Sequence, residues 1–285
     1  MNTRELITML NKDLADEHAA IIRYLIHAYQ EGEDTPLGAG LLSRSREEMW
    51  HMHWLGMIIC DLGGEPDFSP GPYPFDPTDR STVLKSYIDY ELKLIPHYNA
   101  EADAVDDPHI KRVLRREAWE SAIHARRFQR MLDKLSPEEA SSLAVNDHEL
   151  PEAFLEKLQK EVAAQYTGML RHIRMSWMFQ KEDRTGWRLM DQAMEKMKHL
   201  AMFAEAAAED GVVPRLKAES VNTGAAVSQA LQRAIEDISA DLERYSTLTD
   251  EEEFRKHAGL ALKMDLTVQQ LEYQAAEIGD WLKRK

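Results

Sequence analysis

The sequence predicts an all-α protein built from two consecutive four-helix bundles, each with a long crossover between its second and third helices. Apolar residues recur every three to four positions, the spacing of one face of a helix, and strand patterns are almost absent. The helix-breaking residues are clustered, since five of the 11 prolines lie between Gly64 and Arg80. A faint similarity between the two halves indicates one unit used twice.

The first half is expected to hold four helices joined by a Pro-rich link. Residues 64–80 cannot be helical, because proline lacks an N–H donor and clashes with the preceding turn. A link of this length can run along a bundle and make the second and third helices parallel. Asp107 followed by Pro108 marks the start of the fourth helix, as an N-cap followed by a first-turn proline. The expected helices are 3–31, 36–63, 81–105 and 108–135.

The second half begins after a polar stretch, residues 136–150. Asp183 is expected to cap its second helix, which Gly211 and Pro214 terminate. The motif Leu14-x-x-Glu17-x-Ala19-Ala20 recurs 144 positions later, and Glu48 and Gly64 recur 147 positions later as Glu195 and Gly211. We therefore expect domains at 1–137 and 150–285, the second with helices near 151–179, 184–210, 222–246 and 250–283.

Composition excludes several classes of function. The 35 basic against 50 acidic residues give a net charge of −15, which disfavours nucleic acid and anionic membranes as partners. No apolar run of about 18 residues is available to span a bilayer. The N-terminus lacks the order of a secretory signal, and Cys60 alone cannot form an intramolecular disulfide. We expect a cytoplasmic protein.

Acidic and imidazole residues occur at similar depths in all four helices of the first half. Glu17 shares a helical face with Leu14 and Ile21, where a carboxylate is costly to bury unless it is paired or bound to a metal. Glu48 and His51 also share a face, so together they can reach one metal or two adjacent metals. The third helix offers Glu91, and the fourth offers Glu117, Glu120, Ser121 and His124.

Carboxylates from four helices together with two histidines match the arrangement of di-iron and di-manganese proteins. Oxygen and imidazole donors suit iron, manganese or zinc, and the absence of a cysteine set argues against an iron–sulfur cluster. The alternative is a buried polar network without metal. Ionised glutamates packed together without a cation would have steeply raised pKa values and would destabilise the fold.

These segments carry a family resemblance. LNKDLADEHAAIIRYLIHA and EEMWHMHWLGMIICDLGGEP resemble the first two helices of bacterioferritin, and more broadly the ferritin-like superfamily that includes rubrerythrin. The resemblance is closest over residues 8–66, looser to residue 135 and remote over 150–285. It implies two tandem ferritin-like bundles, with Tyr24 near the metals as a hydrogen-bond or electron donor. It also implies that Glu48 is a bridging ligand and that the terminal ligands are Glu17, His51, Glu91 and His124.

The fourth helix departs from the family pattern. With His124 on the family's histidine, the bridging glutamate should stand where the chain has Ser121. Either Glu120 or Glu117 replaces it from one turn away, or the second metal is bound more weakly; we favour Glu120. Met49 stands where bacterioferritin has its haem-binding methionine. The chain has 14 methionines, however, and its non-identical halves break the two-fold symmetry that haem needs, so we do not expect haem.

The second half is interpreted as a degenerate copy with a structural role. Glu161 and Glu195 persist, but the position matching His51 is Lys198, whose ammonium could replace a metal's charge. Candidates for the remaining acids are Glu236 and Asp265. Other histidines are expected at the surface or as hydrogen-bond partners, with His53 and His97 as the first to examine, and the core is expected to include Trp50, Trp54 and Trp119.

The resemblance implies redox chemistry on iron. The first bundle would bind two iron ions, with manganese or zinc as alternatives, and dioxygen or peroxide would oxidise the iron, as in a ferroxidase or peroxide-reducing oxidoreductase. Two other classes remain open. One is a different di-metal enzyme, such as a manganese catalase-like protein or a hydroxylase. The other is a metal-poor helical scaffold, which Ser121 favours. A homo-oligomer is compatible with each.

Overall fold

The computed structural model describes residues 1–285 except 75, 144–149, 182–183, 222–225, 257 and 285. The described residues form helices and no strands, which confirms the all-α prediction. The chain divides into two compact units, residues 1–145 and 146–285, and each unit is a four-helix bundle.

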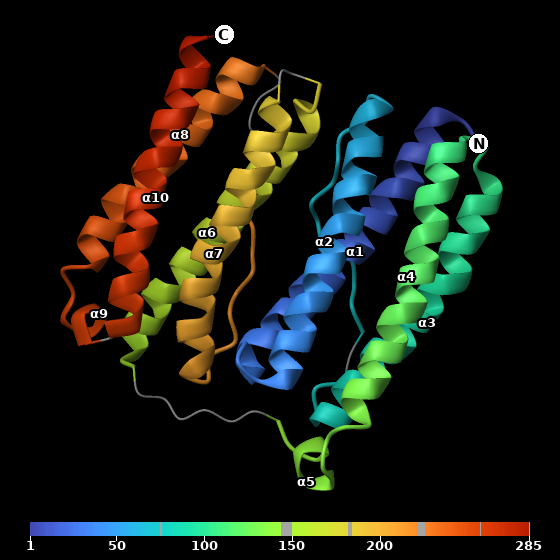
Figure 1. The fold of residues 1–285 in the computed structure, drawn as a ribbon, viewed down its shortest axis with the longest axis horizontal. Helices are drawn as coiled ribbons and strands as arrows, with labels where there is room; N and C mark the ends of the chain where they lie inside the picture. The colour runs from blue at the N-terminus through green and yellow to red at the C-terminus, as the bar shows by residue number, and fades with distance from the viewer. Residues whose placement is uncertain (75, 144–149, 182–183, 222–225, 257, 285) are drawn as a thin grey trace. The chain divides into compact units, whose positions relative to one another are not determined.

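The first unit contains the four expected helices and one short additional helix. Helix α1 packs along α2, α3 packs along α4, and α2 also contacts α4 (Figure 1). Ser136 caps the additional helix, α5, inside the stretch predicted to be a polar link. The helices are α1 (Thr3–Glu31), α2 (Pro36–Asp61), α3 (Arg80–Ala104), α4 (Pro108–Leu132) and α5 (Pro137–Ala140).

Local sequence signals explain the start of α4 and the buried face of α1. The Asp107 side chain accepts hydrogen bonds from the backbone N–H groups of His109 and Ile110, and Pro108 occupies the first turn, as predicted. Burying one leucine or isoleucine side chain contributes about 1.5–3 kcal/mol. The apolar stripe of α1 is at most 2% exposed at Leu10, Leu14, Ile21, Leu25 and Ala28.

The Pro-rich crossover of the first unit lies against α1. The side chain of Asn11 donates to the Glu65 carbonyl and accepts from the Asp67 N–H. Further along, the Gly71 N–H donates to the Ala15 carbonyl over 2.8 Å. A Cβ at Gly71 would stand 3.2 Å from that carbonyl oxygen, so a residue without a side chain suits this close approach. The crossover carries the chain along the bundle, as predicted.

The second unit repeats this arrangement. Helix α6 packs along α7, and α8 packs along α10 (Figure 1). Gly211, with a φ of 73°, ends α7 and donates its N–H to the Ala208 carbonyl. The predicted cap Asp183 lies outside the described residues. The helices are α6 (Glu152–Met178), α7 (Thr185–Glu209), α8 (Val227–Leu248), α9 (Glu252–Lys256) and α10 (Ala258–Lys283), so α9 and α10 share the range expected for one helix.

The crossover of the second unit lies along α6 as its counterpart lies along α1. Gln159 donates to the Val213 carbonyl and accepts from the Arg215 N–H. Two turns later, the Thr167 hydroxyl accepts from the Glu219 N–H. Both units therefore have the predicted layout of helix pair, long crossover and helix pair.

One prediction about the core is wrong. Trp50 is 50% exposed and Trp119 is 63% exposed. Trp50 follows the buried Glu48 by two positions, which places it about 200° around the helix and away from the core. Separately, no helix in the described part of the chain is long and apolar enough to cross a membrane.

Candidate metal centre

Five candidate ligands from the four long helices of the first unit, α1 to α4, are buried in its core. Each is at most 2% exposed, although each is charged or strongly polar. Glu17 lies in the apolar stripe of α1, between Leu14 and Ile21, as the periodicity predicted. A carboxylate in such a position destabilises the fold unless a cation or hydrogen bonds compensate it. The five residues are Glu17 on α1, Glu48 and His51 on α2, Glu91 on α3 and His124 on α4.

These residues form two triads. In the first, each of Glu17, Glu48 and His51 offers one ligand atom, and the three atoms lie within 4.8 Å of one another. His51 Nδ1 is 3.2 Å from Glu17 Oε2 and 2.8 Å from Glu48 Oε2. One metal ion can be held between three atoms at such separations.

The second triad contains Glu48, Glu91 and His124, again with ligand atoms within 4.8 Å. His124 Nδ1 is 2.7 Å from Glu48 Oε1 and 3.4 Å from Glu91 Oε1. His124 Nδ1 and Glu48 Oε1 are close, but their geometry is not that of a hydrogen bond. This is expected of two metal-binding atoms that point toward the same ion. Because Glu48 turns one oxygen to each triad, it has the position of a bridge.

The outer nitrogens of both histidines are held by carboxylates. His51 Nε2 lies 2.6 Å from Glu120 Oε2, and His124 Nε2 lies 2.7 Å from Glu47 Oε2. Such partners fix the orientation of an imidazole and leave its other nitrogen available to a metal. Glu120 therefore lies on the far side of His51 from the triads. Sequence reasoning missed the corresponding role of Glu47.

Glu117 is the buried acid of α4. It is fully buried, and neither of its carboxylate oxygens has a hydrogen-bond partner among the described residues. Burial raises the pKa of the Glu117 carboxyl well above its usual value. Ser121, one turn further along, is also buried but offers only a hydroxyl.

Two tyrosines contact the carboxylates of the triads, and a third, Tyr73, contacts one of these tyrosines. Tyr24 donates to Glu91 Oε1 over 2.7 Å, and its oxygen lies 2.9 Å from the hydroxyl of Tyr73 in the crossover. Tyr98 donates to Glu17 Oε1. Tyr24 was expected near the site. Tyr98 lies two turns after Glu91 on the same helix, so its position was readable from spacing, whereas nothing local in the Pro-rich segment pointed to Tyr73.

Burial and the neighbouring histidines shift the pKa values of two of the carboxylates in opposite directions. Burial raises the pKa of Glu17 to about 7. Burial acts in the same direction on Glu48, but the nearby His124 and His51 outweigh it and hold the pKa of Glu48 below its usual value. The carboxylates in turn raise the pKa values of both imidazoles well above normal, against the effect of burial. In the absence of a metal, the two rings serve as the cations of the site.

The second unit has a different polar core. Lys196 is 1% exposed, and its ammonium lies 3.1 Å from Asp241 Oδ2. Arg244 pairs with both Asp241 and Glu161. Among its described residues, no three His, Cys, Asp or Glu side chains converge as in the first unit. Glu195 instead accepts from Gln274 on α10.

The sequence predicted a buried lysine in this core but placed it two positions too late. Lys198 is exposed, and Lys196 is the buried lysine. Glu236 and Asp265, proposed as counterparts of the remaining acids, are also exposed, and Asp241 takes the buried position. A shift of two residues rotates a side chain by about 200° around a helix, so a weak internal alignment cannot fix which residue faces inward.

Comparison with known proteins supports a ferritin-like helical fold. Over 94 residues the chain is 34% identical to a protein described as bacterial ferritin from Paramagnetospirillum magnetotacticum. The match covers 32% of this chain and 57% of the relative, so the chain spans just over half of that protein's length. No family model matches the chain. No solved structure matches it.

Proposed function

We propose that the first unit is a ferritin-type di-iron carboxylate centre, which binds two ferrous ions and at which dioxygen or peroxide oxidises the iron. The observation that carries this proposal is that Glu48 belongs to both triads. A carboxylate shared between two His-containing ligand sets is what a dinuclear site requires. The similarity to a bacterial ferritin favours iron over manganese or zinc.

The donor set suits two divalent cations. Three carboxylates and two imidazole nitrogens are hard and intermediate donors, as iron, manganese and zinc prefer. Glu48 Oε1 and His124 Nδ1 are buried without a hydrogen bond, and both oxygens of Glu117 are in the same condition. Buried polar atoms are normally paired, and two bound cations would satisfy this group of atoms together.

In this proposal Glu48 would help to hold both ions, because it belongs to both triads. Glu17 and His51 hold one ion, and Glu91 and His124 hold the other. Glu117 is the better substitute for the bridging carboxylate that Ser121 lacks, because it is buried and unpaired while Glu120 is already bonded to His51 Nε2. Glu120 and Glu47 then orient the two imidazoles from outside.

Bound ferrous ions supply the electrons that reduce the oxidant. The protein's own groups hold the ions and control protons around them. Burial raises the pKa of Tyr24 well above its usual value, so the phenol keeps its proton. Its hydroxyl donates a hydrogen bond to Glu91. Tyr73 continues this hydrogen-bonded path from Tyr24 to the crossover.

The second unit is proposed to be a degenerate copy with a structural role. The ammonium of Lys196 and the guanidinium of Arg244 supply the positive charge that metal ions supply in the first unit. Gly168 follows Tyr24 by the same 144-position offset as the repeat motif. Gly168 lies against the aliphatic part of the Lys196 side chain: a Cβ added to Gly168 would be 3.4 Å from Lys196 Cδ. Lys196 therefore lies where the first unit has a tyrosine side chain.

The proposal is tested by oxidation of ferrous iron. The metal-free chain is loaded with ferrous iron under anaerobic conditions and then mixed with dioxygen or with peroxide, while the formation of ferric iron is followed. The wild type and the exposed control Glu33→Gln should show the same rapid phase, and Glu48→Gln should lose it. Equal traces for Glu48→Gln and the wild type would refute the proposal.

A further inference from the structure

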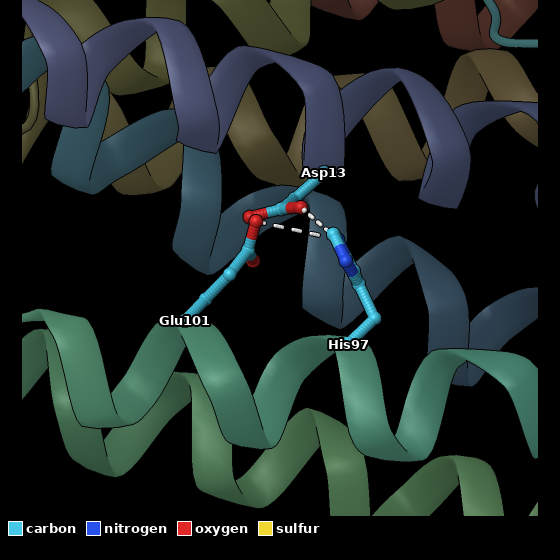
Figure 2. Close-up of side chains that lie close together, drawn as sticks. All are labelled: Asp13, His97 and Glu101. Carbon is cyan, nitrogen blue, oxygen red and sulfur yellow. Dashed lines mark hydrogen bonds and ion pairs between the residues drawn. The ribbon is translucent and has the colours of Figure 1, made fainter.

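A third group of ligand-type side chains lies outside the centre described above. It consists of Asp13 on α1 together with His97 and Glu101, which are one turn apart on α3 (Figure 2). His97 Nε2 is 3.0 Å from Asp13 Oδ1 and 3.3 Å from Glu101 Oε1. One ligand atom from each residue lies within 4.8 Å of the others.

With both carboxyl groups ionised, this group holds two negative charges against at most one positive charge on its imidazole. Two carboxylates face each other and share one imidazole nitrogen (Figure 2). Asp13 is 0% exposed, and its second oxygen, Oδ2, has no hydrogen-bond partner. Glu101 Oε2 is likewise buried and unpaired. Each such atom costs about 1–3 kcal/mol, and more if it is charged, unless something compensates it.

We propose that Asp13, His97 and Glu101 form a third, mononuclear site for a divalent first-row cation such as Zn²⁺, Mn²⁺ or Fe²⁺. One imidazole and two carboxylates on one side of an ion leave coordination positions for water. His97 is 29% exposed, so an ion can reach the group from solvent without opening the bundle.

The geometry also relates this site to the dinuclear centre. Asp13 precedes Glu17 by one helical turn on α1, and His97 adjoins Tyr98, which donates to Glu17 Oε1. An ion held by Asp13 and His97 would therefore stand beside the Glu17 triad on the solvent side. This location suits a station for ions that enter or leave the centre.

A shared proton is the competing explanation for the facing carboxylates. Burial, reinforced by the charge of Asp13, raises the pKa of Glu101 to about 8. Burial also raises the pKa of Asp13, against the effect of His97. A proton held between these carboxylates would reduce the negative charge of the metal-free group, and a bound cation would displace it. Titration of the metal-free protein with a cation separates the two explanations.

The test uses the full chain and Co²⁺, whose visible absorption reports its ligands. In a Glu48→Gln background, which disables the dinuclear centre, one Co²⁺ per chain should still bind. Adding Asp13→Asn, a change that preserves shape, should weaken that binding at least about 10-fold. Adding the control Asp89→Asn, an exposed position on α3, the helix of His97 and Glu101, should leave it unchanged. His97→Gln should weaken Co²⁺ binding as Asp13→Asn does. This variant should still fold, since the His97 side chain is partly exposed.

The outcomes separate this proposal from the previous one. If Asp13→Asn and His97→Gln bind Co²⁺ as tightly as Asp89→Asn, there is no third site and a shared proton explains the group. That result would leave the dinuclear centre untouched. In another outcome, Asp13→Asn loses one bound Co²⁺ per chain, while Glu48→Gln alone binds as many Co²⁺ ions as the wild type. That result would support the third site and refute the dinuclear centre.

Discussion

The imidazole rings of His51 and His124 lie stacked in the first unit, with centroids 5.9 Å apart and planes inclined by 21°. Each ring turns Nδ1 toward Glu48 and Nε2 toward a carboxylate on the opposite side. Each imidazole therefore lies between Glu48 on one side and an outer carboxylate, Glu120 or Glu47, on the other.

The outer carboxylates should tune metal affinity without changing the number of ions bound. Glu47→Gln and Glu120→Gln keep the shape of each side chain but weaken the acceptor for His124 and His51, respectively. Removal of such a partner typically lowers metal affinity about 10–100-fold. Competition with a chelator measures the affinity, and metal analysis at saturation measures the count. If Glu120→Gln loses a whole ion at saturation, Glu120 is a direct ligand, as the sequence alone suggested.

Glu117 should destabilise the metal-free protein increasingly as pH rises. Because burial raises its pKa in the folded state, the folded chain retains a proton that the unfolded chain releases above about pH 4.3. Stability then falls with rising pH, by up to about 1.4 kcal/mol per pH unit. Glu117→Gln removes this effect, so its stability relative to wild type should increase from pH 5 to pH 8 in urea unfolding. A constant difference across that range would contradict the burial of an unpaired acid there.

Lys196 should stabilise the second unit by neutralising Asp241. Lys196→Met leaves a buried carboxylate with Arg244 as its remaining partner, and breaking a buried pair costs about 3–5 kcal/mol. The double variant Lys196→Met/Asp241→Leu removes both charges and should recover much of that loss. Thermal unfolding of the single and double variants measures both effects. Equal stability of Lys196→Met and wild type would refute the structural role.

The second unit should lose stability in acid through two buried histidines. Burial lowers the pKa of His199 to about 4 and that of His172 to about 3. The unfolded chain binds these protons below about pH 6.5, so stability falls as pH drops through the range between the unfolded and folded values. His199→Gln should therefore be more stable relative to wild type at pH 5 than at pH 7. The same relative stability at both pH values would show that His199 is not buried in its neutral form.

Helical periodicity was sufficient to predict that Glu17, Glu48 and His51 face the core of the first unit. Glu17 lies among apolar residues at helical spacing, and Glu48 with His51 lies one turn apart on one face. These relations are local to one helix and survive packing. That α4 lacks one direct ligand because of Ser121 stays a prediction, since Glu117 is buried one turn before it.

The outer shell could not be predicted in the same way. Whether Glu120 or Glu117 faces the centre depends on the rotation of α4 against α2, which no single helix determines. The Tyr73 contact depends on the course of a crossover whose residues have no periodicity. In the second unit, the predicted lysine Lys198 is at the surface and Lys196 is in the core, because residues two positions apart face opposite sides of a helix.

The most direct test of the central claim is a count of bound metal per chain after reconstitution with ferrous iron. Glu48→Ala should bind two fewer ions than wild type, because both triads lose the carboxylate they share. Glu195→Ala, at the repeat-related position in the second unit, should bind as many ions as wild type. Failure of the wild type to retain metal, or equal counts for Glu48→Ala and wild type, would contradict the dinuclear centre.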